Sequence, residues 1–142
     1  MTNSPINGYA ISDIAIIKTN FSRSVILQET ETEKKVNFQI TKIFFQDDML
    51  RCTLHLEYLS VYADGEEEFN AIIDVMGNFK KNGDTELNMQ NFANINAPSI
   101  LFPYLREHLA SLSLKAGIFP IVLAPVNFLA MAEQNIVESK GI

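Results

Sequence analysis

The chain has 142 residues, of which 47% are hydrophobic and 20% charged, and its formal net charge at neutral pH is −6. This length suits a single domain over residues 1–142, and the acidic balance argues against nucleic acid, because phosphate backbones are bound by clustered Lys and Arg. No apolar run reaches the roughly 18 to 20 residues of a membrane span, so we expect no direct membrane insertion.

Four segments in the first two thirds of the chain carry strand patterns. In residues 34–45, Val36, Phe38 and Ile40 alternate with polar residues, and residues 49–62 alternate in the same way. This alternation is typical of strands that bury one face. The sequence therefore predicts strands at residues 9–22, 34–45, 49–62 and 69–79, within a sheet that spans about residues 9–80.

Turn residues between these segments favour an antiparallel meander. Asp64-Gly65 separates the last two strands, and this pair suits a tight hairpin because both positions tolerate positive φ. Asp47-Asp48 fits the turn between the second and third strands. Residues 29–35, with the sequence ETETEKK, are predicted to form a solvated, charged connection between the first and second strands.

The last third of the chain is predicted to form two helices, at about residues 98–116 and 125–138. Pro98 is acceptable near a helix start, but Pro103 would remove a hydrogen bond from a helix interior at a cost of about 3 kcal/mol. We therefore expect regular helix to begin close to Pro103 and to stop at Gly117. Pro125 suits the first position of the second helix. The fold class is α+β, a four-stranded antiparallel meander followed by two C-terminal helices.

The residues that catalytic and metal sites need are not grouped in this sequence. It has no glycine-rich phosphate loop and no pair of cysteines. His55 lies on the polar side of its strand, His108 fits an interfacial or capping role, and Cys52 shares a face with leucines, as a buried thiol would. We therefore predict no enzyme activity, no cofactor and no metal.

The first residues and the cysteine content favour a cytoplasmic location. The N-terminal sequence MTNSPINGYAIS lacks the basic and apolar regions of a secretory signal. The single Cys52 cannot form an intrachain disulfide, which is compatible with a reducing compartment.

The first predicted helix carries more apolar surface than one sheet needs. Leucines recur on it at helical spacing, and further apolar residues lie off that stripe. One face can cover the sheet, so the other must meet another chain or a ligand. We therefore predict an oligomer interface on this helix, with the candidate residues Leu101, Tyr104, Leu105, Leu109 and Leu112.

Residues 117–126, with the sequence GIFPIVLAPV, are nearly continuous in apolar side chains. Their two prolines disfavour both helix and central strand, which predicts an extended connector. The connector either packs on the core as a loop or forms the wall of a groove that takes extended apolar chain from another protein. Residues of the second helix, including an adaptable methionine, would suit such a site. The candidate groove residues are Ile118, Phe119, Pro120, Val122, Leu123, Val126, Phe128 and Met131.

The C-terminal third resembles the SecB family of protein-export chaperones. The family's run is close to P-x-I-L-F-P-Y-x-R-E, followed by G-x-F-P-x-x-x-L-A-P-V-N-F. The N-terminal half resembles the family in strand order and in the GEE that follows the third strand, at residues 65–67. The C-terminal run is matched by Pro98, residues 100–104, Arg106, Glu107, Gly117, Phe119, Pro120 and residues 123–128.

This resemblance implies a dimer of dimers, with the first helices packed in the tetramer interface between sheets. It also implies an ATP-independent holdase without a cofactor, which wraps unfolded or precursor polypeptides around apolar grooves and supports protein export. SecB-like proteins hand the client to the SecA motor through acidic patches on the sheet. Some SecB-like chaperones instead protect the antitoxin of a toxin–antitoxin pair.

The acidic positions of this chain differ from the family pattern. Asn20 and Ser24 align where the first strand of the family carries acidic docking residues, with Arg23 between them. The candidate docking patch is Glu66, Glu67 and Asp74. Two other classes of function remain open, a small-molecule binder or cofactorless enzyme with a cavity between sheet and helices, and a purely structural oligomer.

Overall fold

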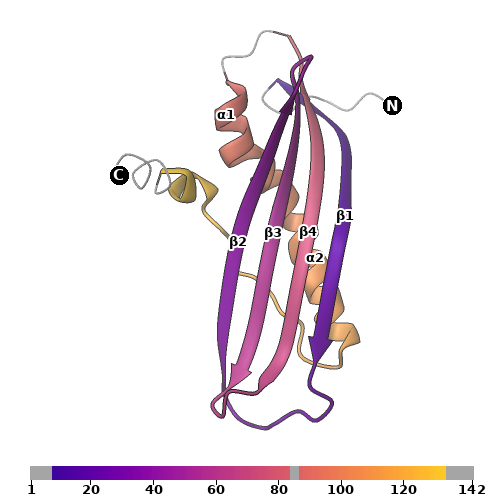
Figure 1. Cartoon of the computed structure of the whole chain (residues 1–142), viewed down its shortest axis with the longest axis vertical. Coiled ribbons are helices and arrows are strands. Elements are labelled where there is room, and N and C mark those ends of the chain that lie inside the picture. The colour runs from indigo at the N-terminus through magenta and orange to yellow at the C-terminus, as the bar shows by residue number, and fades with distance from the viewer. Residues whose placement is uncertain (1–7, 84–86, 134–142) are drawn as a thin grey trace.

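The computed structural model describes residues 8–83 and 87–133, which form a four-stranded antiparallel sheet with helices on one face (Figure 1). This confirms the predicted fold class at the level of an antiparallel sheet followed by C-terminal helices. The elements in chain order are β1 (Tyr9–Arg23), β2 (Thr32–Phe45), β3 (Met49–Tyr62), β4 (Glu67–Lys81), α1 (Met89–Asn91), the π-helical η1 (Phe92–Asn96) and α2 (Ala97–Lys115).

The strand order is β1-β4-β3-β2, so the predicted meander is correct for β2 to β4 and wrong for β1. β1 pairs with β4, with Tyr9 opposite Lys81. The physical reason is the length of the β1–β2 connection, residues 24–31. It crosses the whole end of the sheet (Figure 1), whereas tight turns join the other strands. Both β1 and β2 are therefore edge strands.

The two faces of the sheet differ in character, as the alternating pattern predicts. On β3, Leu50, Leu54 and Leu56 are fully buried beneath the helices, whereas His55 lies on the opposite face. α2 lies close over β4 at Gly77. A Cβ added at this glycine would come within 2.8 Å of Leu101 Cδ2. The core is therefore the layer between β3, β4 and the helices.

The helical region begins earlier than predicted. α1, η1 and α2 follow one another without a break from Met89 to Lys115. The Asn88 side chain accepts a hydrogen bond from the Asn91 N–H at 2.8 Å and so caps the first turn. Pro103 lies inside α2 rather than at its start. No helix in the described ranges is both long and apolar enough to cross a membrane.

Tertiary packing explains how a helix can begin before Pro103. Phe92 is fully buried and its ring stacks on Tyr9, with 3.8 Å between the ring centroids. The preceding turns are therefore held by the core, while Pro103 itself is exposed on the solvent side of α2. The cost of Pro103 is the lost hydrogen bond to the Ser99 carbonyl, and burial of the neighbouring turns offsets it.

The second helix begins later than predicted. Residues 128–133 are helical, and residues 119–127 are neither helix nor strand. Asn127 caps the helix, because its side-chain oxygen accepts the N–H of Ala130 at 3.0 Å. Pro125 therefore belongs to the connector, which is irregular as predicted. The predicted continuation over residues 134–138 lies outside the described residues.

Candidate functional site

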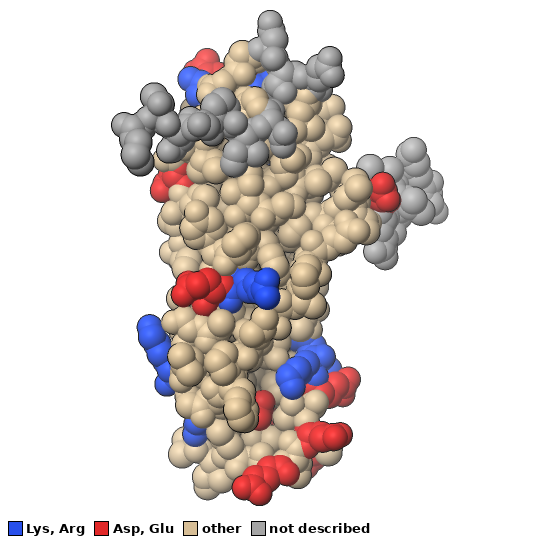
Figure 2. All heavy atoms as spheres, turned by 180° about the vertical axis from the view of Figure 1, so that it is seen from behind, with Lys and Arg blue, Asp and Glu red and all other residues tan. Residues whose placement is uncertain are grey.

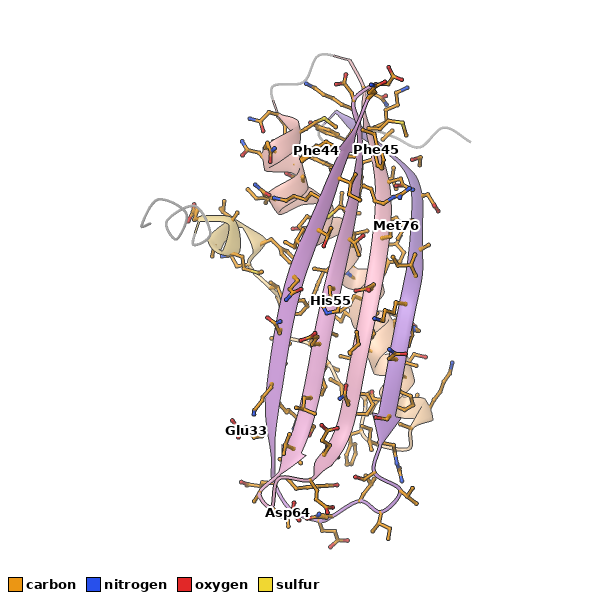
Figure 3. The ribbon with its side chains drawn as sticks, viewed as in Figure 1. Glu33, Phe44, Phe45, His55, Asp64 and Met76 are labelled. Carbon is orange, nitrogen blue, oxygen red and sulfur yellow. The ribbon has the colours of Figure 1, made fainter. Side chains whose placement is uncertain are left out.

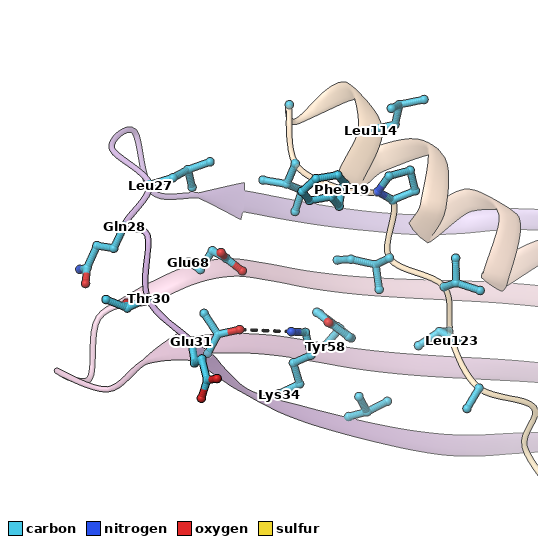
Figure 4. A pocket seen from close by; sticks show the side chains of 18 residues that line it. Leu27, Gln28, Thr30, Glu31, Lys34, Tyr58, Glu68, Leu114, Phe119 and Leu123 are labelled. Carbon is cyan, nitrogen blue, oxygen red and sulfur yellow. Dashed lines mark hydrogen bonds between the residues drawn. The ribbon is translucent and has the colours of Figure 1, made fainter.

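A groove of about 1080 Å³ lies between the connector that follows α2 and the β1–β2 connection (Figure 4). Residues 117–124 and Leu114 form one wall, and the other wall begins at Leu27. The strand residues Val36, Tyr58 and Glu68 line the space between the walls. The groove therefore opens on the face of the sheet that carries the helices.

The connector wall presents some apolar side chains to solvent and buries others. Phe119 is 93% exposed and Val122 is 64% exposed, whereas Leu123 is 5% exposed. Figure 4 shows Phe119 beside Leu114, which is itself exposed at the end of α2. Exposed apolar side chains on one extended segment make a surface that a second apolar chain can cover.

Ser113 fixes this wall to α2. Its side chain is fully buried, donates a hydrogen bond to the Ala110 carbonyl at 2.9 Å and accepts one from the Ile121 N–H at 2.8 Å. The Ile118 N–H also bonds to the Ser113 carbonyl at 3.2 Å. The middle of the connector is therefore held to α2 by hydrogen bonds from its backbone N–H groups, and Phe119 and Val122 can remain exposed. This role could not be predicted from the sequence, because a serine within an apolar helix carries no distinctive pattern.

The second wall was also missed from the sequence. Residues 29–35 were predicted to be a charged connection, but residues 32–35 belong to β2 and the connection is residues 24–31. Leu27 lines the groove, whereas Val25 and Ile26, which are 90% and 81% exposed, are not part of its lining. The rest of this side is polar, with Gln28, Thr30 and Glu31 from the connection and Thr32 and Lys34 from β2. An apolar pattern alone could therefore not have found this wall.

The structure divides the eight candidate groove residues into two groups. Phe128 is 3% exposed and packs edge-on against Phe102, with 6.1 Å between the ring centroids. Val126 and Met131 are partly buried against the same core, away from the groove lining. The residues that do line the groove are Ile118, Phe119, Pro120, Val122 and Leu123.

The candidate interface residues on α2 need a correction. Leu101, Leu105 and Leu109 are fully buried within their own chain, so this stripe covers the sheet and does not face a partner. Leu112 is partly buried against the same core, whereas Tyr104 is 50% exposed. Figure 2 shows one neighbouring pair of acidic and basic side chains near the middle of the helix-bearing face and mostly uncharged side chains above that pair. Of the five candidates, Tyr104 is therefore the most accessible to another chain.

The three acidic candidates do not form one patch. Glu66 and Glu67 lie near the β3–β4 turn, at the end of the sheet where Figure 3 labels Asp64. Asp74 lies seven residues beyond Glu67 on β4, roughly 23 Å away at about 3.3 Å per residue. It lies beside His55, in the middle of the sheet face that points away from the helices. A docking patch can therefore include the first two residues or Asp74, but not all three together.

His55 is held between two carboxylates on this outer face. Its Nδ1 lies 2.5 Å from Asp74 Oδ1, and its Nε2 lies 3.2 Å from Glu57 Oε1. Partial burial alone would lower the pKa of His55, but the hydrogen bonds to Asp74 and Glu57 outweigh it, and together with the carboxylate charges they raise that pKa. The protonated ring satisfies both carboxylates at once.

We expect His55→Gln to reduce stability most at low pH. A histidine whose pKa is raised on folding contributes stability that is fully present below its unfolded pKa of about 6.5 and is lost as the pH rises through the folded value. Urea unfolding of the wild type and the variant should therefore give a stability difference at about pH 5.5 that shrinks towards pH 9. A stability difference that is the same at every pH would contradict a protonated His55 ring bonded to Asp74 and Glu57.

The amino-acid sequence of this chain is similar to the proteins of one known family. The family model described as "Preprotein translocase subunit SecB" matches residues 5–139. The protein-export protein SecB of Magnetococcus marinus is 31% identical over 103 residues, which cover 71% of this chain and 66% of that protein. The protein-export protein SecB of Nitrosococcus oceani is 29% identical over 135 residues, which cover 89% and 80%.

A solved structure shares the fold. It is the Mycobacterium tuberculosis Rv1957 SecB-like chaperone in complex with a ChAD peptide from the Rv1956 HigA1 antitoxin. The TM-score is 0.73 at 14% identity, and the match covers 84% of this chain and 91% of that one. At this identity the likeness concerns the fold alone.

Proposed function

The chain belongs to the SecB family, and from that premise we propose that it is an ATP-independent holdase chaperone for protein export. Its clients are unfolded or precursor polypeptides, which it binds in the cytoplasm. Binding involves no catalysis and no cofactor. The observation that carries this proposal is the groove, in which Phe119, Val122 and Leu114 are exposed along one wall.

The energetics of the groove suit temporary holding. Complete burial of an exposed Phe, Val or Leu side chain contributes about 1.5–3 kcal/mol, and a few such contacts must also offset the ordering of a flexible client. Apolar contacts are non-directional, so they accept many sequences. The groove therefore favours extended apolar segments as a class over any one partner.

A homotetramer, a dimer of dimers, would strengthen this binding. We place the helix contact between copies at the exposed side of α2 around Tyr104, because the leucine stripe is occupied by the chain's own sheet. Several grooves on one particle bind several segments of one long client, and the second segment then binds at a high effective concentration. Several weak grooves together thus hold a client longer than one groove does.

Membership of the SecB family suggests two roles for the bound client. In the export route, SecA is the partner, and Glu66 and Glu67 are the better candidates for its docking, because they are exposed while Asp74 is engaged by His55. In the second route, the client is an antitoxin. The likeness to the SecB-like chaperone solved with an antitoxin peptide favours testing it.

The test is aggregation of a chemically denatured precursor protein, followed by light scattering after dilution. We expect suppression at about one chaperone tetramer per client, with no requirement for ATP, and a tetrameric mass in multi-angle light scattering. Equal light scattering with and without the chaperone would contradict the holdase proposal. Identification of the bound clients separates the routes, since signal-bearing precursors indicate export and one abundant small antitoxin indicates the other.

A further inference from the structure

One side chain joins the two walls of the groove. Arg23, the last residue of β1, lies opposite the buried Phe69 in the sheet register and so faces the helices. Its Nη1 donates a hydrogen bond to the Ala116 carbonyl at 2.8 Å, and its Nη2 donates one to the Val25 carbonyl at 2.8 Å. Its Nε donates a third to the Ser24 carbonyl at 2.7 Å.

These carbonyls belong to the segments that lead into the two walls. Ala116 ends α2 and directly precedes the connector, whereas Ser24 and Val25 begin the β1–β2 connection. The Ala116 carbonyl is at a helix C-terminus, where backbone carbonyls lack partners and a cation is favoured. The planar guanidinium presents its donors in a fixed fork, so the bonds to both walls define one separation between them.

Other bonds hold each wall to its own support. Ser24 N–H bonds to the Glu68 carbonyl at 3.0 Å, and Gln28 N–H bonds to the Tyr62 hydroxyl at 2.9 Å, which ties the β1–β2 connection to the sheet. Ser113 ties the connector to α2. Among the hydrogen bonds of the described residues, those of Arg23 are the ones that connect the segments leading into the two walls.

We propose that Arg23 is a positioning residue for the groove, which fixes the distance between its walls and thereby its fit to an extended client. This inference rests on the proposed function. It also gives a role to a residue that lies between the two positions where the family resemblance places acidic docking residues. Arg23 faces the groove side of the sheet, so its charge acts within the chain.

The test compares Arg23→Gln and Arg23→Lys with the wild type. Arg23→Gln is expected to weaken binding of a fluorescent unfolded client about tenfold, mainly through faster dissociation, and to speed amide exchange over residues 24–28 and 117–121. Arg23→Lys keeps the charge but cannot reach both walls in the same fork geometry, so it should behave like Arg23→Gln. Lys18→Gln removes a cation from the same strand on its other face, and is expected to change neither measurement.

Unchanged exchange in both walls of Arg23→Gln would overturn the proposal, as would full binding by Arg23→Lys with wild-type exchange. If the wild type itself binds no unfolded client, the holdase proposal fails, yet the exchange measurement still decides whether Arg23 couples the walls. If Arg23→Gln does not fold, Arg23→Lys supplies both measurements.

Discussion

Phe119→Asp is expected to weaken the binding of an unfolded client at least about tenfold while leaving the stability of the chain unchanged. Phe119 is 93% exposed on the connector wall, so the folded chain gains little from it. A client that covers this ring gains about 1.5–3 kcal/mol, and a carboxylate in its place removes that gain and must be desolvated. Each 1.4 kcal/mol corresponds to a factor of about ten in affinity.

The measurement is fluorescence anisotropy of a labelled unfolded client, paired with urea unfolding of each variant. Phe45→Asp is the matched control. Phe45 is 46% exposed at the end of β2, and Figure 3 shows it at the opposite end of the sheet from the Asp64 turn, away from the groove. We expect this control to bind the client as the wild type does. Equal binding by folded Phe119→Asp would remove the connector from the client site.

The strand boundaries followed from local pattern, but the pairing of β1 did not. Residues 49–62 were predicted as a strand and form β3 with the same bounds, because period-two alternation reports directly on one buried face. The partner of β1 depends on how residues 24–31 cross the end of the sheet. Nothing local in those residues decides between the two edges that a connection of this length can reach.

The helix start illustrates a local rule outweighed by packing. The cost of Pro103 is local and follows from the sequence, but the burial of Phe92 against Tyr9 involves residues far apart in the sequence. The local sequence around Pro103 carries the first effect, whereas the second depends on the tertiary fold. The same limit applies to the leucines of α2, whose stripe predicts a buried face but does not say which chain covers it.

The groove was predictable in composition and unpredictable in detail. The prolines and apolar residues of the connector predicted an irregular segment, and residues 119–127 are neither helix nor strand. Which apolar side chains face outward depends on backbone bonds from Ser113 and Arg23. Phe119 and Phe128 therefore looked alike in the sequence, although one is exposed and the other is buried.

Phe128→Ala is expected to show the opposite result to Phe119→Asp, a loss of stability of about 3–5 kcal/mol. Phe128 packs against Phe102, whose ring lies 6.1 Å from that of Phe38 on β2. This cluster anchors the far end of the connector to both α2 and the sheet. Urea unfolding at one fixed protein concentration measures the loss, because assembly makes apparent stability depend on concentration. Phe128→Leu keeps most of the apolar volume and should lose less.

The comparison of the two phenylalanines separates the core from the client site. If Phe128→Ala lowers the urea midpoint but retains client binding under native conditions, Phe128 supports the connector from beneath. If instead its midpoint matches the wild type and client binding is lost, the ring faces the client, contrary to its 3% exposure. That outcome would mean that the end of the connector opens when a client binds, because only then could so buried a ring reach another chain.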